Sequence, residues 1–161
     1  MNNRDSFNKQ NEISKPSVKA VIESLESWHW LVKDVEDSKY FQSIDVDLVV
    51  DDCKYVEVKY DTRMRQTGNL FIENISCCEV MSKGWFQKTR ADQIYYIEAK
   101  KNEYDVCHIF NMDELRDYVQ NEKPIAKRIY DYQDRKWKEA YLVSIDKVKK
   151  FPSYDSFLLA V

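Results

Sequence analysis

The segment from Ile44 to Tyr60 constrains the fold most, because apolar and polar residues alternate along it on both sides of a short polar break. The two alternating stretches read Ile44-Asp-Val-Asp-Leu-Val-Val50 and Tyr55-Val-Glu-Val-Lys-Tyr60, and Asp51-Asp-Cys-Lys54 separates them. Alternation with a period of two is typical of strands that bury one face. The sequence therefore predicts a β-hairpin.

The length of the turn decides which side chains of this hairpin meet. A turn of three residues, 51–53, would place Asp47 opposite Glu57 and Asp45 opposite Lys59. Side chains alternate along a strand, so all four polar groups would then lie on one face, with paired Cβ atoms about 5 Å apart. A slip of one residue would reverse the faces. The apolar residues would fill the other face as core: Val46, Leu48, Val56 and Val58.

The rest of the chain predicts one domain of mixed α and β structure. Apolar spacings of three and four predict a helix of about five turns over 18–35, after a polar arm of residues 1–17 with Ser17 as a candidate helix cap. Further strands are predicted at 69–73, 93–97 and 106–110, a helix over 112–120 capped by Asn111, and a strand-rich tail over 127–161. This order gives an α/β or α+β fold with a mixed sheet and a single domain over 18–161.

Two carboxylates and an ammonium at this spacing suit chemistry around a divalent cation. Asp47 and Glu57 supply the hard oxygen ligands that Mg²⁺ takes together with waters and phosphate, and Asp45 is a further candidate ligand. A bound cation lowers the pKa of a water and polarises a phosphate, and Lys59 could orient the attacking water and stabilise growing charge. Phosphodiester hydrolysis uses all three groups. The competing interpretation is an ordinary polar strand face.

A second Glu-x-Lys sequence serves as an internal control. In Glu98-Ala-Lys100 the nearest upstream acid is Asp92, only six positions before Glu98. Six positions leave too few residues for two strands and a turn. The second copy therefore lacks the partner acid that the first copy has.

A helix followed by a hairpin that carries Asp and Glu-x-Lys resembles the PD-(D/E)xK nuclease superfamily, which has the restriction-endonuclease-like fold. The ten-residue interval from Asp47 to Glu57 is similar to that of its short-hairpin members, such as phage Holliday-junction resolvases. The resemblance implies an αβββαβ core over roughly residues 18–110, with extra C-terminal strands.

The resemblance also implies roles for individual residues. Asp47 and Glu57 would bind Mg²⁺ or Mn²⁺, Lys59 would be catalytic, and the substrate would be DNA. Val46 stands where the family nominally has proline, and Asp45 competes for the aspartate role. Many members add an acid from the first helix, and the candidates here are Glu23, Glu26 and Glu36.

Two basic pairs are candidates for nucleic-acid binding. Arg63 and Arg65 follow the predicted hairpin directly and could contact phosphates beside the metal. Lys88 and Arg90 are interleaved with Trp85 and Phe86, a mixture that can stack a base and hold a phosphate. A solvated loop and a packed aromatic pair are the respective alternatives.

Charge and composition narrow the class of function. With 25 basic and 28 acidic residues the net charge is -3, which does not favour coating of nucleic acid by charge alone. No apolar run is long enough to span a membrane and no secretory signal is evident, so a cytoplasmic location is expected. Four cysteines form no C-x-x-C pair, which argues against structural zinc.

The resulting expectation is a metal-dependent endonuclease on DNA, for which the resemblance suggests a phage or mobile-element origin. The alternative is a catalytically inactive nuclease-like fold that binds a protein partner, for instance in phage–host antagonism. The acidic net charge and the eleven Tyr favour that alternative. A metal-dependent enzyme on a smaller phosphate ester is a third, and a homodimer stays open because resolvase-like members often pair.

Overall fold

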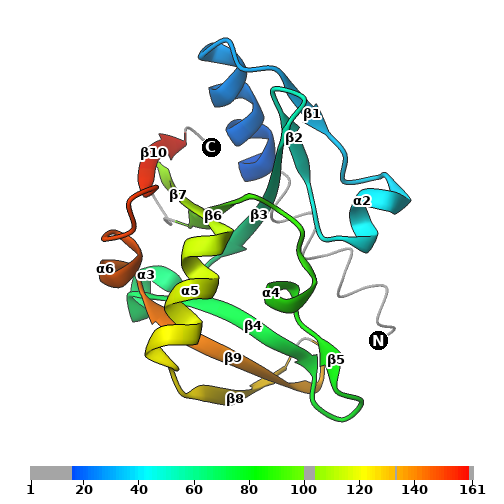
Figure 1. Cartoon of the computed structure of the whole chain (residues 1–161), viewed down its shortest axis with the longest axis vertical. Coiled ribbons are helices and arrows are strands. Elements are labelled where there is room, and N and C mark those ends of the chain that lie inside the picture. The colour runs from blue at the N-terminus through cyan, green and yellow to red at the C-terminus, as the bar shows by residue number, and fades with distance from the viewer. Residues whose placement is uncertain (1–15, 100–103, 133, 160–161) are drawn as a thin grey trace.

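Two β-sheets and a set of helices make up the fold (Figure 1). The computed structural model describes residues 16–99, 104–132 and 134–159. The first sheet has six strands in the order β1-β2-β3-β6-β7-β10. These strands span Val32–Asp34, Leu48–Val50, Lys54–Asp61, Gln93–Glu98, Asp105–Asn111 and Asp155–Leu159.

The second sheet has four strands in the order β5-β4-β9-β8. They span Ser82–Lys83, Asn69–Cys77, Lys136–Ser144 and Ala126–Asp131. A helix over residues 16–27 precedes the sheets. The other helices are α2 Lys39–Ser43, α3 Met64–Thr67, α4 Trp85–Lys88, α5 Met112–Glu122 and α6 Ile145–Val148.

The strand directions confirm the predicted α+β class with a mixed sheet. Strands β3 and β6 run parallel, while the neighbouring pairs of the six-strand sheet are antiparallel. The four-strand sheet is antiparallel throughout. A parallel neighbour needs a crossover connection. Here that connection contains α3, β4, β5 and α4, so the chain visits the second sheet between β3 and β6.

The predicted hairpin and its register are confirmed. Strand β2 pairs with β3 so that Leu48 faces Val56 and Val50 faces Lys54, with the three residues 51–53 as the turn. Asp51 and Asp52 adopt positive φ values of 50° and 57°, which Asp tolerates better than most residues. The first strand is shorter than predicted, because residues 44–47 form a turn and loop after α2 and β2 begins only at Leu48.

The predicted first helix is too long. The helix ends at residue 27, and His29 has a φ of 65°, a left-handed conformation that breaks the helix. Val32, which continues the helical spacing in the sequence, pairs with Val50 in β1 instead. Ser17 lies inside the helix rather than before it, and its hydroxyl donates to Asp105.

Other elements agree with the sequence, with one change of place. The strands predicted at 93–97 and 106–110 are β6 and β7, and the helix predicted after Asn111 is α5, although the Asn111 side chain makes no capping bond. The tail supplies β8, β9 and β10 as predicted. The strand predicted at 69–73 is β4, but it pairs with β9 in the second sheet. Residues 1–15 of the predicted arm lie outside the described residues.

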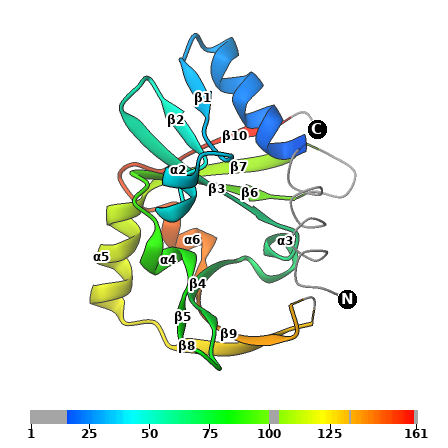
Figure 2. The same ribbon diagram turned by 90° about the vertical axis from the view of Figure 1, so that its right-hand side faces the viewer.

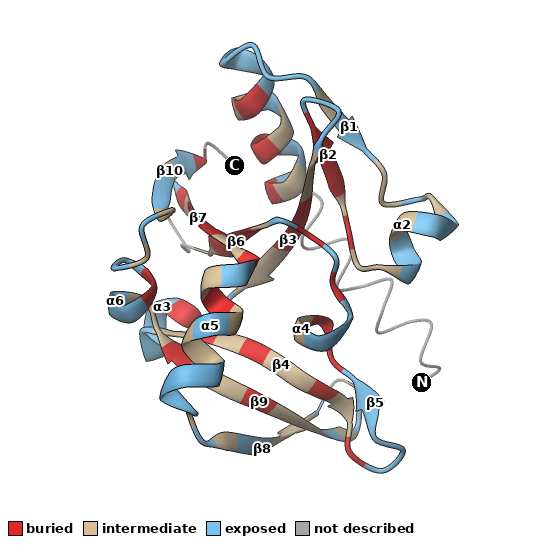
Figure 3. Cartoon of the chain, in the orientation of Figure 1, coloured by how far each residue is buried: buried red, intermediate tan, exposed pale blue. Residues whose placement is uncertain are grey.

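The six-strand sheet is covered on both faces. The helix over residues 16–27 packs on one face, where Val21 and Leu25 meet Leu48, Val56 and neighbouring strand residues. The other face joins the four-strand sheet and α5 in a second cluster. Figure 2 shows that helix over the six-strand sheet and the four-strand sheet at the opposite end of the molecule, and Figure 3 shows that the helix, both sheets and α5 each carry buried residues.

Val46 corrects one detail of the predicted core. It is buried, as expected, but it belongs to the cluster that contains Tyr96 and Phe110 rather than to the one with Leu48 and Val56. The reason is that Val46 precedes β2 and no longer follows its alternation. Within the three described ranges, no helix combines the length and the apolar character needed to cross a membrane.

Candidate functional site

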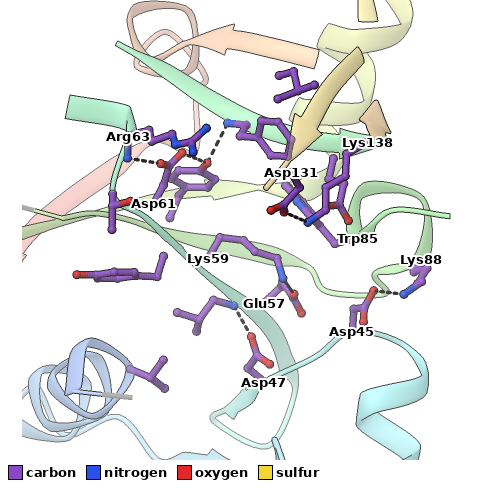
Figure 4. A pocket seen from close by; sticks show the side chains of 18 of the residues that line it. Asp45, Asp47, Glu57, Lys59, Asp61, Arg63, Trp85, Lys88, Asp131 and Lys138 are labelled. Carbon is purple, nitrogen blue, oxygen red and sulfur yellow. Dashed lines mark hydrogen bonds and ion pairs between the residues drawn. The ribbon is translucent and has the colours of Figure 1, made fainter. Parts of the chain in front are cut away.

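A cleft of about 1100 Å³ lies between the two sheets. One wall comes from the β2–β3 hairpin and the loop before it, and the facing wall comes from β4, β8 and β9. All four polar residues that the hairpin register predicts on one face line this cleft: Asp45, Asp47, Glu57 and Lys59. Figure 4 shows them from close by, with Asp131 and Lys138 on the facing wall.

The hairpin holds the three central groups through backbone and side-chain contacts. Lys59 forms an ion pair with Oε1 of Glu57, its neighbour on the same face of β3. Asp47 directly precedes β2, and its Oδ2 accepts a hydrogen bond of 2.8 Å from the backbone N–H of Val58. The ammonium of Lys59 also lies 5.5 Å from the centre of the Trp85 ring, a cation–π contact that stabilises its positive charge. The alternation of β3 therefore presents a fixed acid–amine pair beside a second acid.

Glu57 is the most deeply buried member of the group. Only 3% of its side chain is exposed, against 29% for Lys59. Its Oε2 atom is buried and has no hydrogen-bond partner. An unsatisfied buried carboxylate oxygen carries a substantial desolvation cost. Because Glu57 lines the cleft, this oxygen remains available as a ligand for a cation bound there.

The electrostatics of the site reflect this burial. Desolvation raises the pKa of Glu57 to about 8, although the charge of Lys59 opposes the shift. Desolvation likewise raises the pKa of Asp47, against the lowering effects of Lys59 and of the Val58 hydrogen bond. For Lys59 burial opposes the charged form, but the charges of Glu57 and Asp47 outweigh it and raise its pKa. Lys59 therefore stays charged, but its single positive charge does not bring the pKa values of Asp47 and Glu57 back to their ordinary range.

The residues present fit a divalent cation. Mg²⁺ is commonly held by one or two carboxylates and completes its shell with waters and phosphate oxygens. Asp47 and Glu57 supply two carboxylates, and Oε2 of Glu57 has no other partner. Among residues 16–99, 104–132 and 134–159, no group of three or more His, Cys, Asp or Glu side chains is arranged to hold a metal. Two carboxylates leave the remaining positions of the metal shell to waters and a phosphate, so the fit is to an open site that a substrate completes.

Asp45 lies apart from the strand pairing that was expected to place it opposite Lys59. The pairing of β2 covers only Leu48–Val50, and Asp45 sits in the preceding loop with a φ of 46°. Its Oδ2 is 3.7 Å from the ammonium of Lys88 but forms no hydrogen bond. Asp45 lines the cleft and adds negative charge near Asp47 and Glu57.

The four basic residues predicted to bind nucleic acid divide into two groups. Arg63 and Lys88 line the cleft. Arg65, in α3, and Arg90, after α4, are exposed and lie outside the residues that line it. The structure thus brings one residue of each predicted pair to the site.

The structure adds residues that the sequence analysis did not select. Asp61 follows Lys59 at the same alternation, and its Oδ2 accepts a 2.6 Å hydrogen bond from the Tyr96 hydroxyl. That hydroxyl in turn accepts from the backbone N–H of Phe71, at the start of the facing wall. The period of two in β3 could have indicated Asp61. Nothing local indicates Tyr96, because its partners are 35 and 25 positions away.

The cleft as a whole is acidic. Nine Asp and Glu residues line it, against four Lys and Arg residues. Three of those basic residues are already in ion pairs with acids: Lys59, Lys88 and Lys138. Of the second Glu-x-Lys sequence, Glu98 contacts His108 and is not among the residues that line the cleft, and Lys100 lies outside the described residues.

Comparisons of this chain with protein-family models, with curated proteins and with solved structures found no match.

Proposed function

We propose that this protein is a metal-dependent nuclease that hydrolyses phosphodiester bonds in DNA, with Mg²⁺ or Mn²⁺ at Asp47 and Glu57. The observation that carries the proposal is the buried, unpartnered Oε2 of Glu57 at an open cleft, beside a second carboxylate and a charged lysine. In a purely structural ion pair, an unpartnered buried carboxylate oxygen lowers stability without any benefit. In a cation site that a phosphate completes, the same oxygen is a ligand for the metal.

The residues of the chain divide the work. Asp47 and Glu57 would hold the cation, which when bound supplies an acidified water and polarises the phosphate. Lys59 is held by Glu57 and Trp85 with its ammonium at the cleft, where it orients the attacking water and stabilises negative charge on the phosphate oxygens. Arg63 and Lys88 extend positive charge along the cleft toward the flanking phosphates.

The arrangement of elements supports the resemblance to PD-(D/E)xK nucleases. A helix precedes three antiparallel strands, β1-β2-β3, and β6 lies parallel beside β3, as an αβββαβ core requires. The connection between β3 and β6 departs from that pattern, because it contains strands β4 and β5 of the second sheet and two four-residue helices instead of one long helix. Val46 before Asp47 is a further departure. Of the candidate acids, Glu36 lines the cleft but follows β1 instead of lying in the first helix, and Glu23 and Glu26 are not among the lining residues.

A surface outside the cleft favours the alternative function as a protein-binding module. Trp28, just after the first helix, is exposed by 49%. Trp28 contacts Phe157, so the end of the first helix and β10 share this apolar surface. Exposed apolar patches are common at protein interfaces. Under this alternative the cleft would bind no metal and cut no DNA.

Cleavage of DNA by the purified protein tests the proposal. We expect cleavage with Mg²⁺ or Mn²⁺, none with EDTA, and a loss of roughly 10²- to 10³-fold in rate for Lys59→Met. Lys83→Met is the matched control, because Lys83 is exposed in β5 and does not line the cleft. Cleavage that persists in EDTA, or an unchanged rate for Lys59→Met, would overturn the proposal. Absence of both cleavage and metal-binding heat would favour the protein-binding alternative.

A further inference from the structure

The depth of the cleft limits what can reach the candidate metal site. The side chain of Glu57 is 3% exposed, and the site lies between two sheets. The walls are joined by a chain of hydrogen bonds from Phe71 N–H to Tyr96 and from Tyr96 to Asp61, of 2.9 and 2.6 Å. The two walls therefore meet at Phe71 and Asp61, and a phosphate has to approach the site from elsewhere along the cleft. A flexible chain can do so more easily than the wide, stiff rod of a duplex.

The charge of the cleft points the same way. Duplex DNA carries one negative charge per about 1.7 Å of its axis, and proteins hold it mainly with Lys and Arg. This cleft has nine acidic and four basic residues, and three of the basic ones are paired with acids. A single strand carries about half that charge density, and a divalent cation at Asp47 and Glu57 offsets part of the repulsion. Contacts other than charge must then supply much of the binding.

The facing wall offers such contacts. Phe71 and Leu142 are direct cross-strand partners in β4 and β9, and Ile129 lies on the same face in β8, opposite Lys138. All three line the cleft and are only partly buried. Side chains that stack on bases without regard to sequence are typical of single-strand binding. Phe71 and Leu142 thus place an aromatic ring and an aliphatic side chain on the wall across from the carboxylates and Lys59, on the same wall as the Glu73–Lys138 ion pair.

We infer that the substrate is single-stranded DNA, with an unpaired base packed on Phe71 and Leu142 while the neighbouring phosphate reaches Asp47, Glu57 and Lys59. This inference rests on the proposed nuclease function and names its substrate class. In this arrangement Phe71 binds the base, and its backbone N–H, through Tyr96, fixes the distance between the two walls.

Cleavage of matched substrates tests the inference. The substrates are a labelled single-stranded oligonucleotide and the same strand in a blunt duplex, assayed with Mn²⁺ at fixed ionic strength. We expect kcat/KM to be at least tenfold higher for the single strand. Phe71→Leu keeps apolar bulk but removes the aromatic ring, so it should raise KM for the single strand about 5- to 150-fold, with kcat within a few-fold. Phe71→Trp should keep KM low.

Controls separate the possible failures. Tyr104→Ala removes an exposed aromatic residue that does not line the cleft, and it should change neither parameter. Equal or faster cleavage of the duplex, or an unchanged KM for Phe71→Leu, would overturn the single-strand inference and leave the nuclease proposal standing. Failure of the wild-type protein to cut either substrate with any divalent cation would overturn the nuclease proposal instead.

Discussion

The two walls of the cleft each hold a lysine among carboxylates, yet the two groups differ in how their charges are satisfied. On the hairpin wall Lys59 pairs with Glu57, and Asp47 lies nearby. On the facing wall Lys138 pairs with Glu73, Asp131 and Asp134 at 3.3, 2.8 and 3.4 Å. By composition alone the second group looks like the stronger metal site. Its lysine, however, already occupies the position that a cation would take.

Burial and pKa separate the two walls. Glu73 and Asp131 keep 14% and 20% of their side chains exposed, whereas Glu57 keeps 3% and has an oxygen without a partner. Burial opposes ionisation of Asp134, but the Lys136 hydrogen bond and the Lys138 charge outweigh it and lower its pKa. Burial instead prevails at Glu57 and raises its pKa to about 8. The carboxylates of the facing wall are paired with lysines, whereas the hairpin wall keeps a buried carboxylate oxygen without a partner.

The largest expected difference between the two walls is in their contribution to the rate of DNA cleavage. Glu57→Gln should lower the rate of metal-dependent DNA cleavage roughly 10³-fold, because it removes a charged ligand for the cation. Glu73→Gln should change it less than a few-fold, since Glu73 serves the ion pair with Lys138. Initial rates with Mn²⁺ measure both. Equal losses would mean that the walls act as one site.

The second effect of Glu57→Gln is on the free energy of unfolding without metal. There the substitution should stabilise the protein, although it lowers the rate of cleavage. Glu57→Gln should be more stable than wild type in EDTA, because the buried acid has a folded-state pKa of about 8 against an ordinary value of 4.5. Below pH 4.5 the acid is protonated in both states and adds no pH-dependent penalty. Between pH 4.5 and 8 only the unfolded chain releases the proton, so wild type loses up to about 1.4 kcal/mol per pH unit relative to the variant.

Urea unfolding of both proteins at pH 5, 6.5 and 8 measures that difference. It should grow with pH and shrink when Mn²⁺ is added, since a cation stabilises the ionised acid. A difference that stays constant across this range would show that Glu57 ionises as freely in the folded protein as in the unfolded chain.

The third effect is on the facing wall. Lys138→Met should destabilise the protein by about 2 kcal/mol, because it leaves three carboxylates near one another without their shared cation. The figure is below that for a fully buried pair, since these side chains retain some solvent. Lys83→Met is the exposed control, and thermal unfolding at pH 7 measures both. A stable Lys138→Met would remove the contrast between a satisfied and an unsatisfied wall.

The sequence predicted the hairpin wall well because that wall is local. The alternation of 44–60 and the three-residue turn placed Asp47, Glu57 and Lys59 at one cleft, as the structure does. Asp45 was misplaced, since the strand begins only at Leu48 and the residues before it form α2 and a loop. The same alternation extends to Asp61, which the sequence analysis did not use.

The facing wall could not be predicted, because its partners are distant in the sequence. Strand β4 alternates clearly, but its neighbour β9 begins only at Lys136. The pairing of β4 with this distant strand decides which sheet β4 joins. The first helix was predicted too long for a similar reason. Val32 fits a helical spacing, and only the turn at His29 and the pairing with Val50 place it in a strand.

The smallest effect concerns the link between the two walls. Tyr96→Phe removes the hydroxyl that joins Asp61 to Phe71 N–H, so it should destabilise the protein by about 1 kcal/mol, the typical net value of a hydrogen bond. Tyr95→Phe is the matched control, because Tyr95 is buried on the opposite face of the same strand. If the hydroxyl also sets the spacing of the walls, Tyr96→Phe should raise KM for single-stranded DNA more than it lowers kcat. A loss of stability no larger than that of Tyr95→Phe, with unchanged KM, would mean that the walls hold their spacing through core packing alone.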